Sequence, residues 1–129
     1  MFYATHYDVQ AEDLVAAKHE IDIHLTAGVI HQMDIMFEDG CAYDVAVQIF
    51  HGGAQIWPSE PGTSFRGNST IVSFREFFPL LKAVNTLRAV IWTEDAASIG
   101  MVVIQFGVLP PEIIQPLSFA GLLQAVGAV

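Results

Sequence analysis

The stretch that decides the fold, residues 33–58, reads MDIMFEDGCAYDVAVQIFHGGAQIWP. Apolar and polar residues alternate in it twice, over residues 33–37 and again over residues 43–50. A period of two is typical of strands that bury one face. The pair Gly52-Gly53 accepts the backbone dihedrals of a two-residue hairpin, and Pro58 stops the returning strand. The stretch therefore predicts antiparallel strands joined by tight turns.

Similar strand patterns occur on both sides of this stretch. Further strands are predicted at residues 20–25, 70–74, 86–93 and 99–109. A turn is expected at residues 26–28, and the aromatic run over residues 75–81, which contains Pro79, predicts an irregular connector. About seven or eight short strands with almost no helical periodicity predict an all-β fold, an antiparallel β-sandwich of jelly-roll or immunoglobulin-like type.

The chain length of 129 residues fits a single domain. We expect the β-sandwich domain over residues 19–110, because Pro110 and Pro111 end its last strand. Residues 1–18 are expected as an N-terminal arm, with a short strand possible at residues 2–9 and a helical turn or two near residues 11–17. Residues 111–129 are expected as an apolar C-terminal arm.

Composition favours self-association. The chain is 53% hydrophobic and only 15% charged, which is more apolar side chain than a small core readily hides. We therefore expect a homo-oligomer. The net charge is −9, and the five basic residues are scattered along the chain, so the sequence argues against direct binding of nucleic acid.

The sequence predicts neither a secretion signal nor a membrane anchor. Its first residues lack the basic region followed by an apolar core that a secretion signal requires. Residues 113–129 carry too many polar side chains for a stable transmembrane helix. The single cysteine, Cys41, cannot form an internal disulfide.

Two histidines suggest a metal hypothesis. His24 and His31 follow each other on neighbouring predicted strands, and Asp22 or Asp34 could complete a zinc site between them. No compact zinc-binding spacing and no nucleophile motif accompany them. We therefore predict that the protein is not an enzyme and has no metal and no cofactor, and we keep a small metal-dependent enzyme as a third possibility.

The longest irregular stretch, residues 58–68, predicts a surface loop, where recognition residues concentrate. Trp57 precedes it and could stack on a sugar ring. The candidate recognition residues are Trp57, Ser59, Glu60, Arg66 and Asn68.

Several turn and strand-end segments carry a family resemblance. They read AGVIHQ (27–32), FEDGC (37–41), GAQIWPS (53–59), SFRE (73–76) and FGVLP (106–110). Over about residues 20–110 this order resembles small β-sandwich structural proteins of tailed-phage particles, of the decoration or head-tail accessory type. The resemblance implies a subunit that assembles symmetrically on a capsid or tail, with its termini as arms. Its location would then be the virion, and its partner a major capsid or tail protein.

The function expected from the sequence is thus a non-enzymatic structural protein that oligomerises through sandwich edges and terminal arms. The candidate interface residues are the apolar ones of the C-terminal arm, namely Ile113, Ile114, Leu117, Phe119, Leu122 and Leu123. The alternative is a β-sandwich module that binds a carbohydrate or a receptor through Trp57 and the loop that ends at Asn68.

Overall fold

The computed structural model describes residues 1–110, and these residues form one antiparallel sheet of seven strands. The strand order is β1-β7-β2-β6-β3-β4, and β5 pairs with β3 beside this path. The elements are β1 (Phe2–Asp8), the short 3-10 helix η1 (Val15–Ala17), β2 (His19–Phe37), β3 (Val45–His51), β4 (Ala54–Trp57), β5 (Phe65–Arg66), β6 (Thr70–Thr93) and β7 (Met101–Leu109). The predicted all-β, sandwich-like fold is confirmed.

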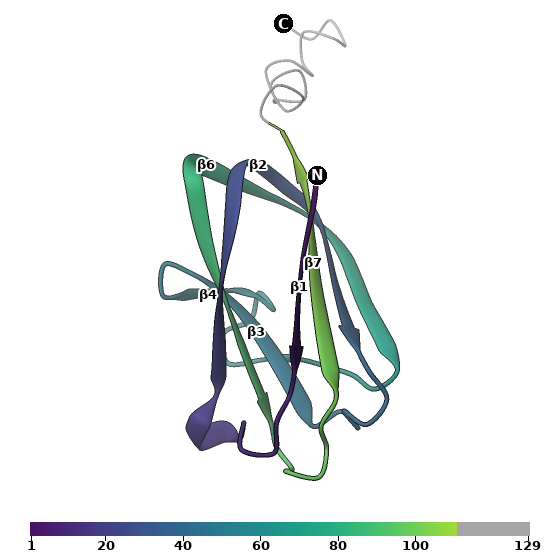
Figure 1. Ribbon diagram of the computed structural model, residues 1–129. Helices are drawn as coiled ribbons and strands as arrows, with labels where there is room; N and C mark the ends of the chain where they lie inside the picture. The colour runs from purple at the N-terminus through teal and green to yellow at the C-terminus, as the bar shows by residue number, and fades with distance from the viewer. Residues whose placement is uncertain (111–129) are drawn as a thin grey trace, which may run out of the picture.

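Two long strands, β2 and β6, fold the sheet into two layers (Figure 1). The first half of β2, residues 19–26, pairs with residues 84–91 of β6, and residues 87–93 of β6 in turn pair with β3. The second half of β2, residues 29–37, lies between β7 and residues 70–79 of β6. We call the first group with β4 the β3 layer, and the second group with β1 the β1 layer. Each long strand thus belongs to both layers.

The bend in β2 lies where its register with β6 shifts, between Thr26 and Gly28 and between Ile30 and Gln32. Such irregularities bend a strand and increase its twist. Gly28 has a φ of +154°, and a Cβ atom there would lie 2.3 Å from the carbonyl oxygen of Leu109. The glycine therefore permits a close approach of two backbones. The predicted turn at residues 26–28 is wrong, because the strand continues through it.

The predicted connector over residues 75–81 is also wrong, because these residues belong to β6. The reason for that prediction was Pro79, since proline has no N–H group to donate to a neighbouring strand. It is tolerated because this half of β6 is an edge strand with β2 on one side only. The hairpin prediction is confirmed: His51 pairs with Ala54, and Gly52 and Gly53 have φ values of +59° and +87°.

The N-terminal segment forms a strand of the sheet, next to β7. Residues expected as an arm form β1, which pairs with β7 from Phe2 to Asp8. The amino group of Met1 donates to the carbonyl oxygen of Val108 at 2.8 Å. The helical turn expected near residues 11–17 is present as η1. The C-terminal arm, residues 111–129, lies outside the described residues.

Side chains from both layers fill one core. In β3, where alternation was predicted, the apolar residues Val45, Val47 and Ile49 are fully buried, and Ala46 and Gln48 between them are buried as well. The first three pack in the same cluster as Ile35 and Phe106 of the β1 layer. Within residues 1–110, no helix is long and apolar enough to cross a membrane.

We predict that Gly28→Ala destabilises the protein by about 2–4 kcal/mol, because the added methyl group meets the Leu109 carbonyl and forces the two backbones apart. Chemical denaturation measures this loss. The matched control is Gly53→Ala, which has a similarly unfavourable φ but no described atom within 4 Å of the new Cβ, and should lose about 1 kcal/mol. Equal losses in the two variants would mean that close approach is unimportant at Gly28.

Candidate interaction surfaces

The structure buries the aromatic residue expected to recognise a sugar. Trp57 is only 4% exposed, and its ring lies edge-on to Phe74 and Phe78 at centroid distances of 5.9 and 5.5 Å. Phe106 lies on its other side, at 6.4 Å. Trp57 therefore closes the core between the layers, and a stacking role for it is incompatible with this packing.

The other loop candidates divide into two kinds. Ser59 and Glu60 are exposed. Arg66 instead forms an ion pair with Glu94 at 2.9 Å, and the side-chain oxygen of Asn68 accepts hydrogen bonds from the backbone N–H groups of Gly40 and Ala42. Arg66 and Asn68 thus hold neighbouring segments in place.

Sequence analysis missed the residue that shapes this loop. The Gln55 side chain donates to the carbonyl oxygens of Pro58 and Thr63 at 2.9 and 3.1 Å, and accepts a hydrogen bond from the Gly62 N–H. Gln48 also donates to Thr63, at 2.9 Å. These amide side chains form hydrogen bonds with loop backbone groups that, in a regular sheet, would bond to a neighbouring strand. A glutamine near a Pro- and Gly-rich stretch was the available signal.

The pairing required by the zinc hypothesis is absent. Because β2 continues through residues 26–28 without reversing direction, His24 and His31 lie on the same strand instead of opposite one another on neighbouring strands. The His24 Nδ1 atom is 3.1 Å from the Thr86 hydroxyl, and His31 lies edge-on to Phe2. Among residues 1–110, no three His, Cys, Asp or Glu side chains are grouped to hold a metal ion.

A tyrosine with a perturbed pKa lies where β1 meets β2. The Tyr7 hydroxyl donates to the Asp13 carboxylate at 2.5 Å, and its ring stacks on His19 at a centroid distance of 3.7 Å. Burial, reinforced by the hydrogen bond to Asp13, raises the pKa of Tyr7 to about 12. Asp13 is buried and also accepts from the Gln10 N–H at 2.8 Å. These contacts close the seam between the layers on this side.

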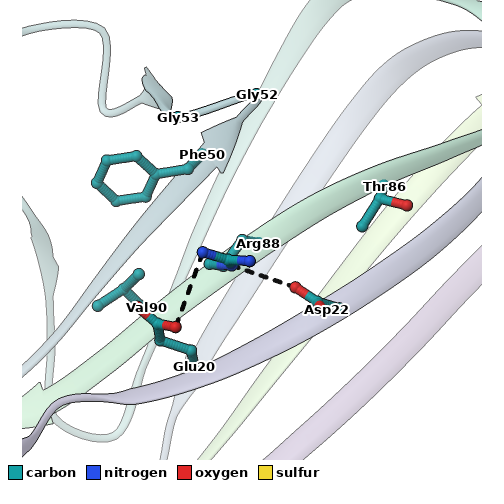
Figure 2. Close-up of a pocket in the computed structure, with 8 residues that line it drawn as sticks. All are labelled: Glu20, Asp22, Phe50, Gly52, Gly53, Thr86, Arg88 and Val90. Atoms are coloured by element: carbon teal, nitrogen blue, oxygen red, sulfur yellow. Dashed lines mark hydrogen bonds and ion pairs between the residues drawn. The ribbon is translucent and has the colours of Figure 1, made fainter.

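A shallow groove of about 560 Å³ crosses the outer face of the β3 layer. Figure 2 shows Arg88 at its centre, reaching toward Asp22 and Glu20 on the neighbouring strand, with Phe50 and the Gly52-Gly53 turn on the other side. The Arg88 Nε atom lies 3.2 Å from Asp22, and one terminal nitrogen lies 3.8 Å from Glu20. All three charged side chains are about half exposed, so the pairs contribute little to stability.

Two residues that line the groove, Val90 and Phe50, belong to a small apolar cluster with Trp92. Trp92 is 5% exposed, with the Lys18 ammonium 4.1 Å from its ring and its Nε1–H donating to Glu94 at 3.1 Å. Hydrogen bonds from Arg66 and then from Trp92 hold the pKa of Glu94 below its ordinary value. An aromatic ring beside ordered polar groups is the chemistry of sites for small polar ligands. The charged residues at the groove's centre are, however, already paired with each other.

Four of the five most exposed large apolar residues among residues 1–110 lie on β6, and the other is Phe2 of β1, which is 72% exposed. Leu81 is 88% exposed, Phe77 is 65% exposed, and Ile71 and Val84 are each 64% exposed. Ile71 continues across the sheet into Met36 of β2 and Val103 of β7, so the outer face of the β1 layer also has an apolar row. The first half of β6 is in addition an edge strand. Exposed apolar surface therefore coincides here with backbone that has no strand partner within residues 1–110.

The interface residues expected in the C-terminal arm, from Ile113 to Leu123, lie outside the described residues. Of the exposed residues of β6, Phe77 and Leu81 lie in the predicted irregular connector and Ile71 in a predicted strand, and the apolar interface was predicted in the uncharged C-terminal arm instead. No protein-family model and no curated protein sequence matches the chain.

We predict that Tyr7 makes stability fall with alkaline pH. Unfolded tyrosine loses its proton near pH 10, whereas Tyr7 keeps it up to about pH 12, so deprotonation favours unfolding as the pH rises through this window. In denaturant titrations from pH 9 to 12, Tyr7→Phe should lose less stability than the wild type. Tyr43→Phe, at an exposed ring, is the control and should behave like the wild type. Parallel losses in the wild type and Tyr7→Phe would contradict the assignment.

Proposed function

We propose that the chain is a non-enzymatic structural protein whose work is assembly, of the virion decoration or accessory type. The observation that carries the proposal concerns β6, which combines a strand edge without a partner among residues 1–110 with four of the five most exposed large apolar side chains in that range. The exposed edge of a sheet is a ready template for pairing with another chain.

The energetics favour burial of this surface. Fully burying a large apolar side chain contributes about 1.5–3 kcal/mol, and Phe77, Leu81 and Val84 follow each other along a short piece of β6. Association must also overcome the loss of translational and rotational freedom, about 4–15 kcal/mol. Three apolar side chains alone are therefore marginal. Backbone pairing along the edge, or many copies on one particle, would supply the remainder.

The only cysteine of the chain does not support an enzymatic alternative to this proposal. Cys41 is fully buried, and burial raises the pKa of its thiol. A buried thiol is a poor nucleophile.

The virion part of the proposal rests on the resemblance of the turn and strand-end segments to small β-sandwich proteins of tailed-phage particles. A sandwich that presents an edge and an apolar strand suits such a role, because these proteins work by covering or joining larger shells. The partner would be a major capsid or tail protein.

We predict that the purified wild-type protein is an oligomer and that Phe77→Ser/Leu81→Ser weakens its association at least about tenfold. Both side chains are exposed, so the double variant should keep the fold and its unfolding transition. Light scattering coupled to size exclusion, over a dilution series, measures the change in mass.

The matched control is Leu14→Ser/Val15→Ser, which removes two exposed apolar side chains around η1, away from the β6 edge. Its mass should remain that of the wild type. A wild-type protein that is monomeric up to millimolar concentration would contradict the assembly function.

We predict that mass spectrometry finds the chain, at a fixed number of copies per particle, in virions purified from the phage that encodes it. If purified particles lacked the chain while infected cells contained it, the virion location would be wrong, and assembly of the protein by itself would remain to be explained.

A further inference from the structure

We propose that residues 71–77 of β6 pair edge to edge, antiparallel, with the same residues of a second copy, with a two-fold axis beside Phe74. The inference rests on the proposed assembly function and names its first contact. It is carried by the direction of the backbone groups, the order of side chains along the edge, and two charged residues that form no ion pair within residues 1–110.

The edge is open on the side that a second copy would use. Residues 70–79 of β6 pair with β2, whereas β3 pairs only with the other half of β6, from Leu87 to Thr93. In Figure 1 this first half of β6 forms the outermost strand of the β1 layer, beside β2. Its other long side has no strand partner within the described residues.

The backbone groups of alternate residues point to this open side. The Glu38 N–H donates to the Met101 carbonyl on β7 at 3.0 Å, so even-numbered residues of β2 here bond to β7 and odd-numbered ones to β6. The register places Met33 and Ile35 opposite Phe74 and Val72. Phe74 and Val72 thus bond to β2. By alternation, the N–H and C=O groups of residues 71, 73, 75 and 77 point outward.

One register satisfies both the backbone and the side chains. With the two-fold axis beside Phe74, Ile71 lies opposite Phe77 of the second copy, and Ser73 lies opposite Arg75 of the second copy. Each of these pairs brings together residues whose backbone groups point outward, so each can exchange two hydrogen bonds. Apolar side chains meet apolar ones on the outer face.

Neighbouring registers are worse. With the axis beside Arg75, that residue faces its own copy, and like charges directly opposite are destabilising. With the axis beside Ser73, Ile71 faces the charged Arg75. Of the three registers compared, the one about Phe74 avoids both of these conflicts on the outer face and keeps outward-pointing backbone groups together. On the inner face it places Val72 opposite Glu76 of the second copy.

The charges of the edge are also complementary in this register. Arg75 is exposed and forms no ion pair among residues 1–110, where the arginine pairs involve Arg66 and Arg88. Asp34, one strand further in, accepts hydrogen bonds from Ser73 and Gln32 but has no ion-pair partner in the same residues. Arg75 of the second copy, opposite Ser73, approaches this carboxylate. The two-fold axis produces the contact twice.

The β6 edge also limits the length of the new ladder and the number of copies that it can join. Pro79 has no N–H to donate, so the new ladder ends before it. A two-fold contact uses the same edge of both copies and closes on itself, leaving neither copy with a free β6 edge. The expected product is a dimer with one continuous sheet through two β1 layers, and not a fibre growing from β6.

The test is a charge exchange across the axis. Ser73→Lys places an ammonium opposite Arg75 of the second copy and should raise the dimer dissociation constant at least about tenfold. Within its own subunit the new lysine lies beside Asp34, so the fold is kept. Ser73→Lys/Arg75→Glu then places opposite charges across the axis and should restore the dissociation constant to within about threefold of the wild type. Ser59→Lys adds the same charge at an exposed loop position and should leave it unchanged.

The outcomes separate this inference from the function on which it rests. If the wild type is monomeric at every concentration, both are wrong. If the wild type associates and Ser73→Lys associates equally well, assembly stands and the β6 edge is not its contact. Loss in Ser73→Lys without recovery in the double variant would overturn the register. Hydrogen exchange gives an independent reading: the amides of residues 73, 75 and 77 should become protected as the wild-type concentration rises, and stay unprotected in Ser73→Lys.

Discussion

The whole structure depends on the pairing of β2 with β6, which continues on both sides of the bend although its register shifts twice there. Both strands run through both layers and are hydrogen-bonded to each other in each of them, so a single sheet forms both sides of the core. The bend is possible because Gly28 lets β2 approach the end of β7 at a distance no side chain would allow. Every other strand is placed by reference to this pair, and the open β6 edge is its direct result.

The two seams between the layers are closed by different means. On the β1 side, Tyr7 stacks on His19 and the Tyr3 hydroxyl lies 2.8 Å from that of Thr26, so polar aromatic contacts join the layers. On the β6 side, Trp57 and the phenylalanines around it close the core with apolar rings. The aromatic residues in the chain are thus used mainly for closure, which leaves few of them for recognition.

Strand existence and face could be read from the sequence, because a period of two is a local property. The inward residues of β3 and the Gly52-Gly53 hairpin were predicted on this ground. Strand continuity could not be read. Gly28 and Pro79 are as acceptable in a turn as in a bent strand or an edge strand. What decides between these states is distant in the sequence: Leu109 lies against Gly28, and β3 does not pair with the half of β6 that contains Pro79. The same limit explains Trp57, whose burial depends on phenylalanines far away in the chain.

Cys41 has a practical consequence for work on this molecule. It is the only cysteine in the chain, and the fold encloses it completely. The native surface therefore has no reactive thiol of its own. One cysteine introduced at an exposed position becomes the single attachment point for a spin label or a fluorophore, so a distance measured between labels in an assembly belongs unambiguously to one known residue in each copy.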